Sequence, residues 1–242
     1  MRCGVRPRVA VLLLAVAAVA SGFSRTSRAY QGSDPQTVTF AARDGVVVTG
    51  SLFLPQKWPA PGVVLLPMAT RNRHDWDVAG QALAVAGVAA LAVDFRRGGS
   101  APGGSGADLV IDAVAARGYL AARPEVAATR IGMGGASLGA NVAALAASND
   151  SSIRSLVLLS ASLDYQGLRI EQALTHFGNR PALLVASSED YYALRTARAL
   201  VTAGAGPREL RVLSEAGHGT AMFTRNPELV DAVVDWFLRT LL

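Results

Sequence analysis

The sequence has one cysteine, Cys3, and one lysine, Lys57, among its 242 residues. A single cysteine excludes an intramolecular disulfide and a cluster of thiolate metal ligands. The lysine stands in no Gly-Lys-Ser or Gly-Lys-Thr sequence, so a phosphate-binding P-loop is excluded as well. The three histidines are scattered along the chain and make a poor set of ligands, so we expect no metal site.

Charged residues are also scarce, at 17% of the chain, whereas apolar residues make up 51%. This composition excludes a disordered polar chain. The formal charge of +5 is unevenly distributed, because residues 1–29 contain five arginines and no acidic residue. The rest of the chain has equal numbers of acidic and basic residues, so we expect no nucleic-acid partner.

Residues 1–29 have the order of features found in a signal peptide. Three arginines precede an apolar run at 9–20, which is shorter than the roughly 20 residues that a spanning helix needs. Small residues offer cleavage after Ala20 or after Ala29, and both alternatives stay open. We therefore expect a periplasmic or secreted protein with no stable membrane span after cleavage. An uncleaved N-terminal segment that anchors the protein to the membrane is the alternative.

Residues 30–242 alternate apolar runs that are typical of buried strands with helical patterns. Strands are expected at 37–40, 46–54, 62–67, 88–94, 130–134, 155–160, 182–186 and 209–213. Helices are expected at 76–86, 107–122, 139–148, 191–203 and 227–242, the first capped by Asp75. The pattern predicts the α/β class, with a single domain built on a mostly parallel, doubly wound sheet with helices on both faces.

Residues 135–139 read Gly-Ala-Ser-Leu-Gly and lie between a predicted strand and a predicted helix. This pattern is typical of a nucleophile elbow, a sharp turn that lifts a serine hydroxyl above the edge of a sheet. The flanking glycines allow the strand and the helix to approach closely. Ser137 is therefore a candidate nucleophile, and the backbone N–H of Leu138 can stabilise an oxyanion at the start of the helix.

The segment around Ser137 has two alternative interpretations. A dinucleotide-binding turn also follows a strand and opens a helix, and Gly132-x-Gly134-x-x-Ser137 approaches its fingerprint. Here, however, serine replaces the third glycine, the segment does not follow the first strand, and no acid ends the next strand near residue 160. A serine that only caps a helix is the simpler alternative.

A serine nucleophile needs a base, and three histidines make the search for that base short. His218 follows the last predicted strand, at the sheet edge where Ser137 is expected, and is the candidate. His74 is interpreted as part of the start of the first helix or of the pocket rim. His176 lies in an irregular connection and is expected to be exposed or to line the pocket.

The acid that orients a catalytic histidine is expected after the next-to-last strand. Asp190 and Glu189 both follow that strand, and we favour Asp190, with Glu189 as the adjacent alternative. Its carboxylate would fix the tautomer of His218 and stabilise the imidazolium. Asp164, after the preceding strand, is a weaker third choice. Asp94 ends another strand and is expected to accept a structural hydrogen bond from the turn that follows it.

The order Ser137, Asp190, His218 on an alternating sheet resembles the α/β-hydrolase fold, in particular small dienelactone-hydrolase-like serine hydrolases. The resemblance spans about residues 37–242, and it is carried by PGVVLLP at 61–67, VDFRRGGS at 93–100, RIGMGGASLGA at 130–140, PALLVASSED at 181–190 and EAGHG at 215–219. It implies that these three residues are catalytic and that no cofactor is needed. Dienelactone hydrolases proper use a cysteine nucleophile, whereas this chain has serine.

The family often has His-Gly after the third strand, where this chain reads Pro-Met-Ala-Thr. A backbone donor does not depend on its side chain, so the N–H of Met68 or of Ala69 is expected to join that of Leu138 in the oxyanion hole. The connection at 161–180 is too short for a full lid, so we expect little or no cap. The open pocket is expected to be lined by Met68, Trp76, Leu138, Leu163, Tyr165 and Tyr191.

The function expected from this site is hydrolysis of a small-molecule carboxylic ester through an acyl-enzyme. Ser137 would attack the carbonyl carbon, His218 would carry the proton, and Asp190 would orient the ring. A serine peptidase on the same fold is one alternative. A non-catalytic secreted binding protein on a hydrolase scaffold is the other, because a fold alone does not determine chemistry.

Overall fold

The computed structural model describes residues 34–69, 71–98 and 101–242, so the expected signal peptide lies outside the described residues. One sheet contains β1 (Gln36–Ala41), β2 (Val47–Phe53), β3 (Ala60–Leu66), β4 (Ala89–Val93), β7 (Val126–Ala136), β8 (Ile153–Leu159), β11 (Ala182–Ser187) and β12 (Arg208–Leu213). Two short hairpins pair β5 (Arg97–Gly98) with β6 (Ala101–Pro102) and β9 (Asp164–Tyr165) with β10 (Leu168–Arg169).

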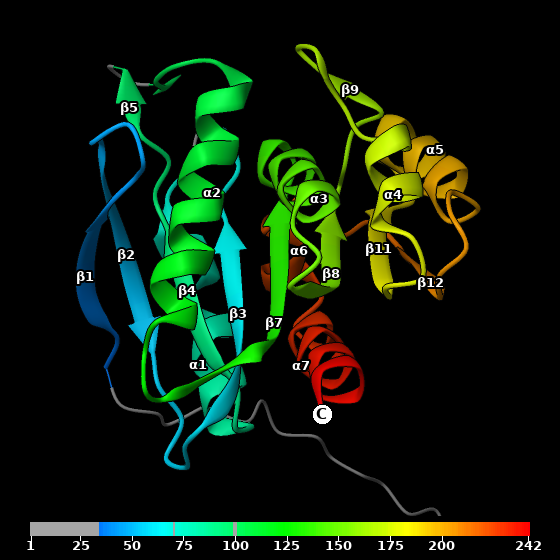
Figure 1. Ribbon diagram of the computed structural model, residues 1–242. Helices are drawn as coiled ribbons and strands as arrows, with labels where there is room; N and C mark the ends of the chain where they lie inside the picture. The colour runs from blue at the N-terminus through cyan, green and yellow to red at the C-terminus, as the bar shows by residue number, and fades with distance from the viewer. Residues whose placement is uncertain (1–33, 70, 99–100) are drawn as a thin grey trace, which may run out of the picture.

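The helices are α1 (Asp77–Val85), α2 (Gly106–Ala121), α3 (Leu138–Asn149), α4 (Glu171–Phe177), α5 (Tyr191–Leu200), α6 (Ala221–Arg225) and α7 (Glu228–Leu241), with a 3-10 helix, η1, at Arg73–Trp76. The strand order in the large sheet is β1-β2-β4-β3-β7-β8-β11-β12 (Figure 1). Strand β2 is antiparallel to β1 and β4, and every pair from β4 to β12 is parallel. The expected mostly parallel sheet in a single domain is confirmed.

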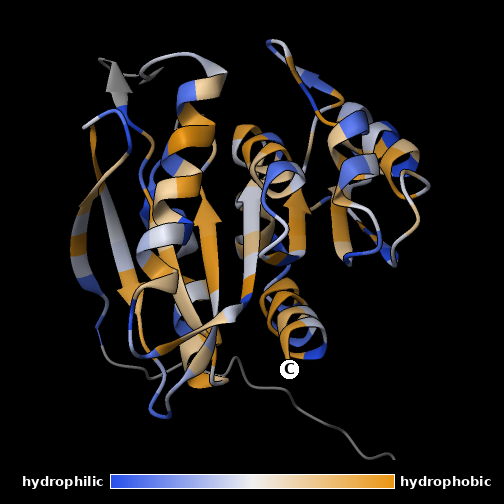
Figure 2. Cartoon of the chain, viewed as in Figure 1, coloured by the Kyte–Doolittle hydropathy of each residue, from blue (hydrophilic) through white to orange (hydrophobic). Residues whose placement is uncertain are grey.

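Helices cover both faces of this sheet, as expected for a doubly wound fold. On one face α2 and α3 pack on β3 and β7, and on the other α1 packs on β4 while α7 packs on β7, β8 and α1. Each face has its own cluster of buried apolar side chains. Every residue of β3 is buried, and Figure 2 shows β3 and β8 as apolar, because a central strand has a helix layer on each side.

Several elements differ from the sequence prediction. Strand β7 begins at Val126, four residues before its predicted start at 130. Helix α6 was not predicted, since its five residues are too short to show a helical period. The predicted Asp75 cap is wrong, because the chain first makes the 3-10 helix η1, where the Asn72 side chain accepts the His74 N–H at 3.0 Å. Residues 161–180 form only a hairpin and α4, so the cap is small.

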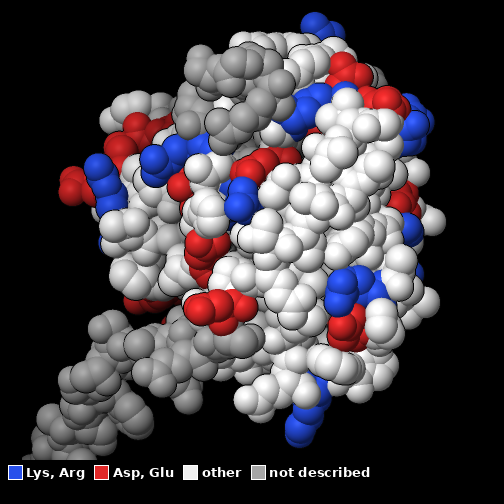
Figure 3. Space-filling view, turned by 90° about the vertical axis from the view of Figure 1, so that its left-hand side faces the viewer, with Lys and Arg blue, Asp and Glu red and all other residues white. Residues whose placement is uncertain are grey.

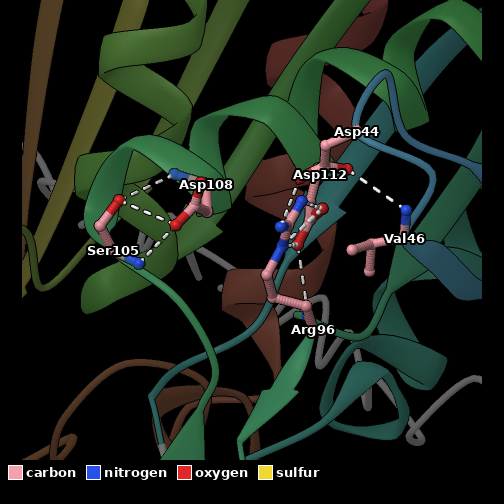
Figure 4. A network of polar contacts seen from close by, with 6 residues as sticks. All are labelled: Asp44, Val46, Arg96, Ser105, Asp108 and Asp112. Carbon is pink, nitrogen blue, oxygen red and sulfur yellow. Dashed lines mark hydrogen bonds and ion pairs between the residues drawn. The ribbon is translucent and has the colours of Figure 1, made fainter.

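A buried ion pair ties the segment after β4 to α2 and to the turn between β1 and β2 (Figure 4). The Arg96 guanidinium donates to Asp112 at 2.6 Å and to Asp44 at 2.6 Å, and Asp112 is fully buried. These two carboxylates raise the pKa of Arg96, and Arg96 in turn lowers the pKa of Asp44. Next to this network, Ser105 and Asp108 form a capping box at the start of α2.

On the face shown in Figure 3, acidic and basic side chains are interspersed and lie beside a broad uncharged area. Within the part of the chain that the structure describes, no helix is both long enough and apolar enough to cross a bilayer. The same residues contain no group of three or more His, Asp or Glu side chains arranged to hold a metal ion.

Candidate active site

Ser137 occupies the sharp turn between β7 and α3. Its backbone has φ 52° and ψ −118°, a conformation that non-glycine residues adopt rarely and at a cost in free energy. The Ser137 N–H donates to the Leu159 carbonyl of the neighbouring strand at 2.8 Å, while the Ser137 carbonyl accepts the N–H of Ala140 at 2.9 Å. The turn is therefore held by the sheet on one side and by the helix on the other.

The two glycines of this segment are required by close backbone contacts. A Cβ atom placed on Gly135 would lie 2.1 Å from the carbonyl oxygen of Gly139. A Cβ atom on Gly139 would lie 2.5 Å from the carbonyl oxygens of both Leu66 and Pro67. Strand β7, helix α3 and the end of β3 thus meet at distances that only glycine permits, as the sequence pattern predicts.

The segments that carry the candidate oxyanion donors meet at the same contact. Leu138 is the first residue of α3, and the first N–H groups of a helix have no partner within the helix. Met68 and Ala69 follow directly on the Leu66 and Pro67 carbonyls that approach α3. The backbone of the β3 loop therefore lies beside the start of α3, as an oxyanion hole made of both requires.

His218 and Asp190 form a hydrogen-bonded pair at the same edge of the sheet. Asp190 Oδ2 lies 2.6 Å from His218 Nδ1, and its other oxygen accepts the Ala193 N–H at 3.2 Å. Asp190 is thus both the acid expected for the histidine and the cap of α5. The side chain of Asp190 is 16% exposed and that of His218 is 51% exposed, so the pair sits where solvent and a small molecule can reach the ring.

The residues next to Ser137 and His218 are in contact with each other. A Cβ atom on Gly219 would lie 3.6 Å from the Cβ of Ala136, and it would overlap the sulfur of Met68. The Gly219 N–H donates to the Ser160 hydroxyl at 2.9 Å. Ser160 follows the strand whose last residue bonds to Ser137, so the structure brings the ends of β3, β7 and β8 to the histidine loop.

Ser160 and Thr220 are site residues that the sequence analysis missed. Ser160 is buried and has φ 49°, a backbone angle that its sequence does not reveal. Thr220 donates to Asp75 at 2.9 Å, and Asp75 also pairs with Arg71 at 2.9 Å. These bonds link the histidine loop to the loop after β3 across 145 residues of sequence, a distance at which no local pattern is informative.

Glu189, the alternative acid, accepts the Gly217 N–H and not the histidine ring, whereas His74 and Asp164 have partners of their own. His74 pairs with Asp77 at 3.0 Å at the start of the first helix, and His176 is exposed on α4. Asp164 pairs with Arg169 in the β9–β10 hairpin.

Asp94 and Trp76 have partners that the sequence analysis did not predict. Asp94 accepts the Arg73 N–H at 2.8 Å and pairs with its guanidinium, while its expected bond to the turn at 96–100 stays a prediction because that turn includes residues outside the described ranges. Trp76 does not line a pocket, because it is fully buried and its ring N–H donates to the Leu66 carbonyl at 3.0 Å. Tyr191 is 80% exposed on α5.

A groove of about 940 Å³ lies between α2, α3 and the β9–β10 hairpin. Its lining is mainly apolar and includes Val110, Ile111, Leu145 and Leu168. Ser137 is not among the lining residues, and neither member of the Asp–His pair is. The groove is therefore a feature of the α2 face and is separate from the candidate site.

No model of a known protein family matches the sequence, and no curated protein matches it. Many solved structures are similar to the described fold. A dienelactone hydrolase from Anabaena variabilis ATCC 29413 has 22% identity and a TM-score of 0.69, over 87% of this chain and 100% of that one. The esterase domain of a Rhodothermus marinus protein has 21% identity and a TM-score of 0.69, with the same coverage.

Est1E from Butyrivibrio proteoclasticus has 17% identity and a TM-score of 0.70, over 86% of this chain and 98% of that one. All three similarities extend over most of this chain and nearly all of each matched structure. They agree with the strand order of the sheet and with the helix layers on its two faces. The chain therefore has the α/β-hydrolase fold.

Proposed function

We propose that the protein is a serine hydrolase that cleaves carboxylic esters of small molecules. The observation that carries the proposal is the His218–Asp190 pair, with 2.6 Å between Nδ1 and Oδ2, in a loop whose next residue, Gly219, lies beside Ala136 at the strained turn of Ser137. The esterase and dienelactone hydrolase names of similar structures support the same class of reaction. Strain at a non-glycine residue is often found at catalytic positions, which a helix cap alone would not require.

The proposed reaction has two steps. The bond between Asp190 and His218 Nδ1 leaves Nε2 free to accept the proton of Ser137 as its oxygen attacks the ester carbonyl. The oxyanion is stabilised by the Leu138 N–H together with that of Met68 or Ala69. The tetrahedral intermediate expels the alcohol, which takes the proton from His218, and an acyl-serine remains.

Water then completes the cycle. It gives a proton to His218 as it attacks the acyl carbon, and the second tetrahedral intermediate releases the carboxylic acid while Ser137 regains its proton. These steps require no cofactor. The Asp190 carboxylate does not take the proton; it keeps the His218 ring oriented and stabilises the imidazolium that forms in each step.

The test is labelling of the folded protein with a fluorophosphonate, followed by mass mapping of the adduct. We expect one adduct, on Ser137, that disappears in Ser137→Ala and His218→Ala. Two variants are matched controls. Ser148→Ala removes another serine hydroxyl from α3, and His74→Ala breaks the other pair between a histidine and a carboxylate, so both should label as the wild type does.

Ester hydrolysis by the same set of variants distinguishes the alternatives. Hydrolysis of aryl esters of graded acyl length supports the proposal, and cleavage of peptide substrates alone would support a peptidase. A folded wild type that neither labels nor hydrolyses would overturn the proposal in favour of a binding protein on this scaffold.

A further inference from the structure

The last residue of β11 and the residues that follow it hold the loop that carries the candidate catalytic histidine. The Ser187 hydroxyl accepts the Ala216 N–H at 2.7 Å, and the Ser188 hydroxyl accepts the Glu215 N–H at 3.3 Å. Neither N–H group takes part in the sheet, because β12 ends at Leu213. The serine hydroxyls at the end of β11 thus accept the free N–H groups of the segment that follows β12, the neighbouring strand.

Glu189 continues this set of bonds to the residue next to the histidine. Its Oε1 accepts the Gly217 N–H at 2.7 Å, and its Oε2 accepts the hydroxyl proton of Ser187. The bond from Ser187 is the main reason why the pKa of Glu189 is lowered from 4.5 to about 2. One carboxylate therefore connects the buried end of β11 to the backbone beside His218.

The loop needs such support because two glycines flank the histidine. Glu215, Gly217 and Gly219 all have positive φ, at 48°, 85° and 59°. Glycine on both sides of His218 leaves many backbone conformations open to it. Asp190 contacts only the ring, so it does not by itself determine where the His218 backbone lies.

We propose that Glu189 is a positioning residue for the hydrolysis proposed above, on which this inference rests. Its carboxylate fixes the Gly217 N–H and so keeps the His218 ring on Asp190 and directed at Ser137. We expect the length of the Glu189 side chain to matter more than its charge, because the hydrogen bond that positions the loop is made to a neutral backbone N–H, that of Gly217.

Two substitutions of the exposed Glu189 distinguish the effect of side-chain length from the effect of charge. Glu189→Gln keeps the length, so its amide oxygen can accept from Gly217 while its NH₂ donates to Ser187. Glu189→Asp keeps the charge but is too short to span the same contacts. The matched control is Glu171→Asp, the same change at an exposed position on α4, outside the site.

The first measurement is kcat and KM for an aryl ester, with enzyme concentration taken from fluorophosphonate titration. We expect Glu189→Asp to lower kcat about tenfold or more with KM unchanged, since small misplacements of a catalytic group have large effects. Glu189→Gln should keep kcat within about threefold of the wild type, because it retains the hydrogen bond to the Gly217 N–H. Glu171→Asp should leave both constants unchanged.

The second measurement does not depend on activity. The proton on His218 Nδ1, held by Asp190, should give a low-field ¹H NMR signal in the wild type, in Glu189→Gln and in Glu171→Asp. It should broaden or disappear in Glu189→Asp, because a mobile ring exchanges that proton with water. A purely structural role would lower thermal stability without changing this signal or kcat per titrated site.

Three results would overturn the inference. They are equal kcat in all variants, a loss in Glu189→Gln as large as that in Glu189→Asp, or an unchanged histidine signal in Glu189→Asp. A wild type that fails to react with fluorophosphonate overturns the proposed function instead. In that case the NMR comparison still tests whether Glu189 positions His218.

Discussion

At the scale of single residues, the site depends on backbone geometry that few side chains tolerate. Ser137 is held at φ 52° by bonds to Leu159 and to the first turn of α3. Gly135 and Gly139 allow that turn because backbone atoms occupy the space where a Cβ would be. Serine does not prefer this backbone conformation, so the surrounding sheet and helix must hold it there, at the edge of the sheet.

Gly135→Ala should destabilise the protein strongly. The new methyl group would meet the Gly139 carbonyl at 2.1 Å, and neither strand nor helix can move without breaking its own bonds. We expect a loss of about 3 kcal/mol in the free energy of unfolding, measured by urea denaturation. Gly118→Ala on α2 is the control, because nothing lies within 4 Å of its new methyl group, and it should be neutral or stabilising by up to about 1 kcal/mol.

Glu189 should make stability depend on pH in acid. Its folded pKa of about 2 lies below the ordinary 4.5, so the folded state binds its proton less readily than the unfolded state does. The stabilisation is complete above pH 4.5 and is lost as the pH falls towards 2. The difference in urea midpoint between wild type and Glu189→Gln should therefore be smaller at pH 3 than at pH 6. An equal difference at both values would contradict the assigned bonds.

At the scale of elements, the sheet places the candidate catalytic residues at its edge while buried polar contacts hold the loops. The segment after β4 is secured by Arg96, which lies between Asp112 of α2 and Asp44 of the β1–β2 turn. The carboxylate of Asp112 is buried and accepts from both the backbone and the side chain of Arg96. Such a pair defines one arrangement of three elements, because a charge left alone in the interior is costly.

Asp112→Ala should cost about 3 kcal/mol of unfolding free energy, because it leaves the inward side of the Arg96 guanidinium unpaired. The same substitution at Asp164, whose partner Arg169 is 82% exposed, should cost less than about 1 kcal/mol. Thermal and urea unfolding of the two variants provide the comparison. Similar losses in both would show that burial does not set the strength of the Arg96 pair.

At the scale of the whole molecule, strand order brings distant segments together. Strands β3, β7, β8 and β11 are neighbours in the sheet and parallel, so the loops after them all open at one edge. Met68, Ser137, Ser160 and Asp190 come from those four loops, and His218 follows the next strand, β12. A parallel sheet thus assembles a site from residues that are far apart in sequence.

We propose that the N-terminal segment directs export of this molecule and is removed by cleavage after Ala20 or after Ala29. Expression of the whole chain in a bacterial host should yield a periplasmic protein whose N-terminus is Ser21 or Tyr30. N-terminal sequencing and intact mass of the fractionated protein distinguish the two cleavage sites. Recovery of the full-length chain in the membrane fraction would support the uncleaved anchor instead.

The amino-acid sequence by itself determined the class of the fold, the candidate nucleophile and base, and a choice of two adjacent residues for the acid. Buried strands such as 62–67 appear as continuous apolar runs, and Gly-Ala-Ser-Leu-Gly can be recognised because its geometry depends on residues within five positions. With three histidines in the chain, the choice of His218 followed from its place after the last strand.

The tertiary structure decided every contact that spans a long stretch of chain. Asp94 bonds to Arg73, 21 residues away. Thr220 reaches Asp75, and Glu189 holds Gly217 while Asp190 takes the imidazole ring. Which of two adjacent acids meets the histidine depends on the path of two loops in space. That path is set by packing and hydrogen bonding across the sheet, which local sequence patterns do not encode.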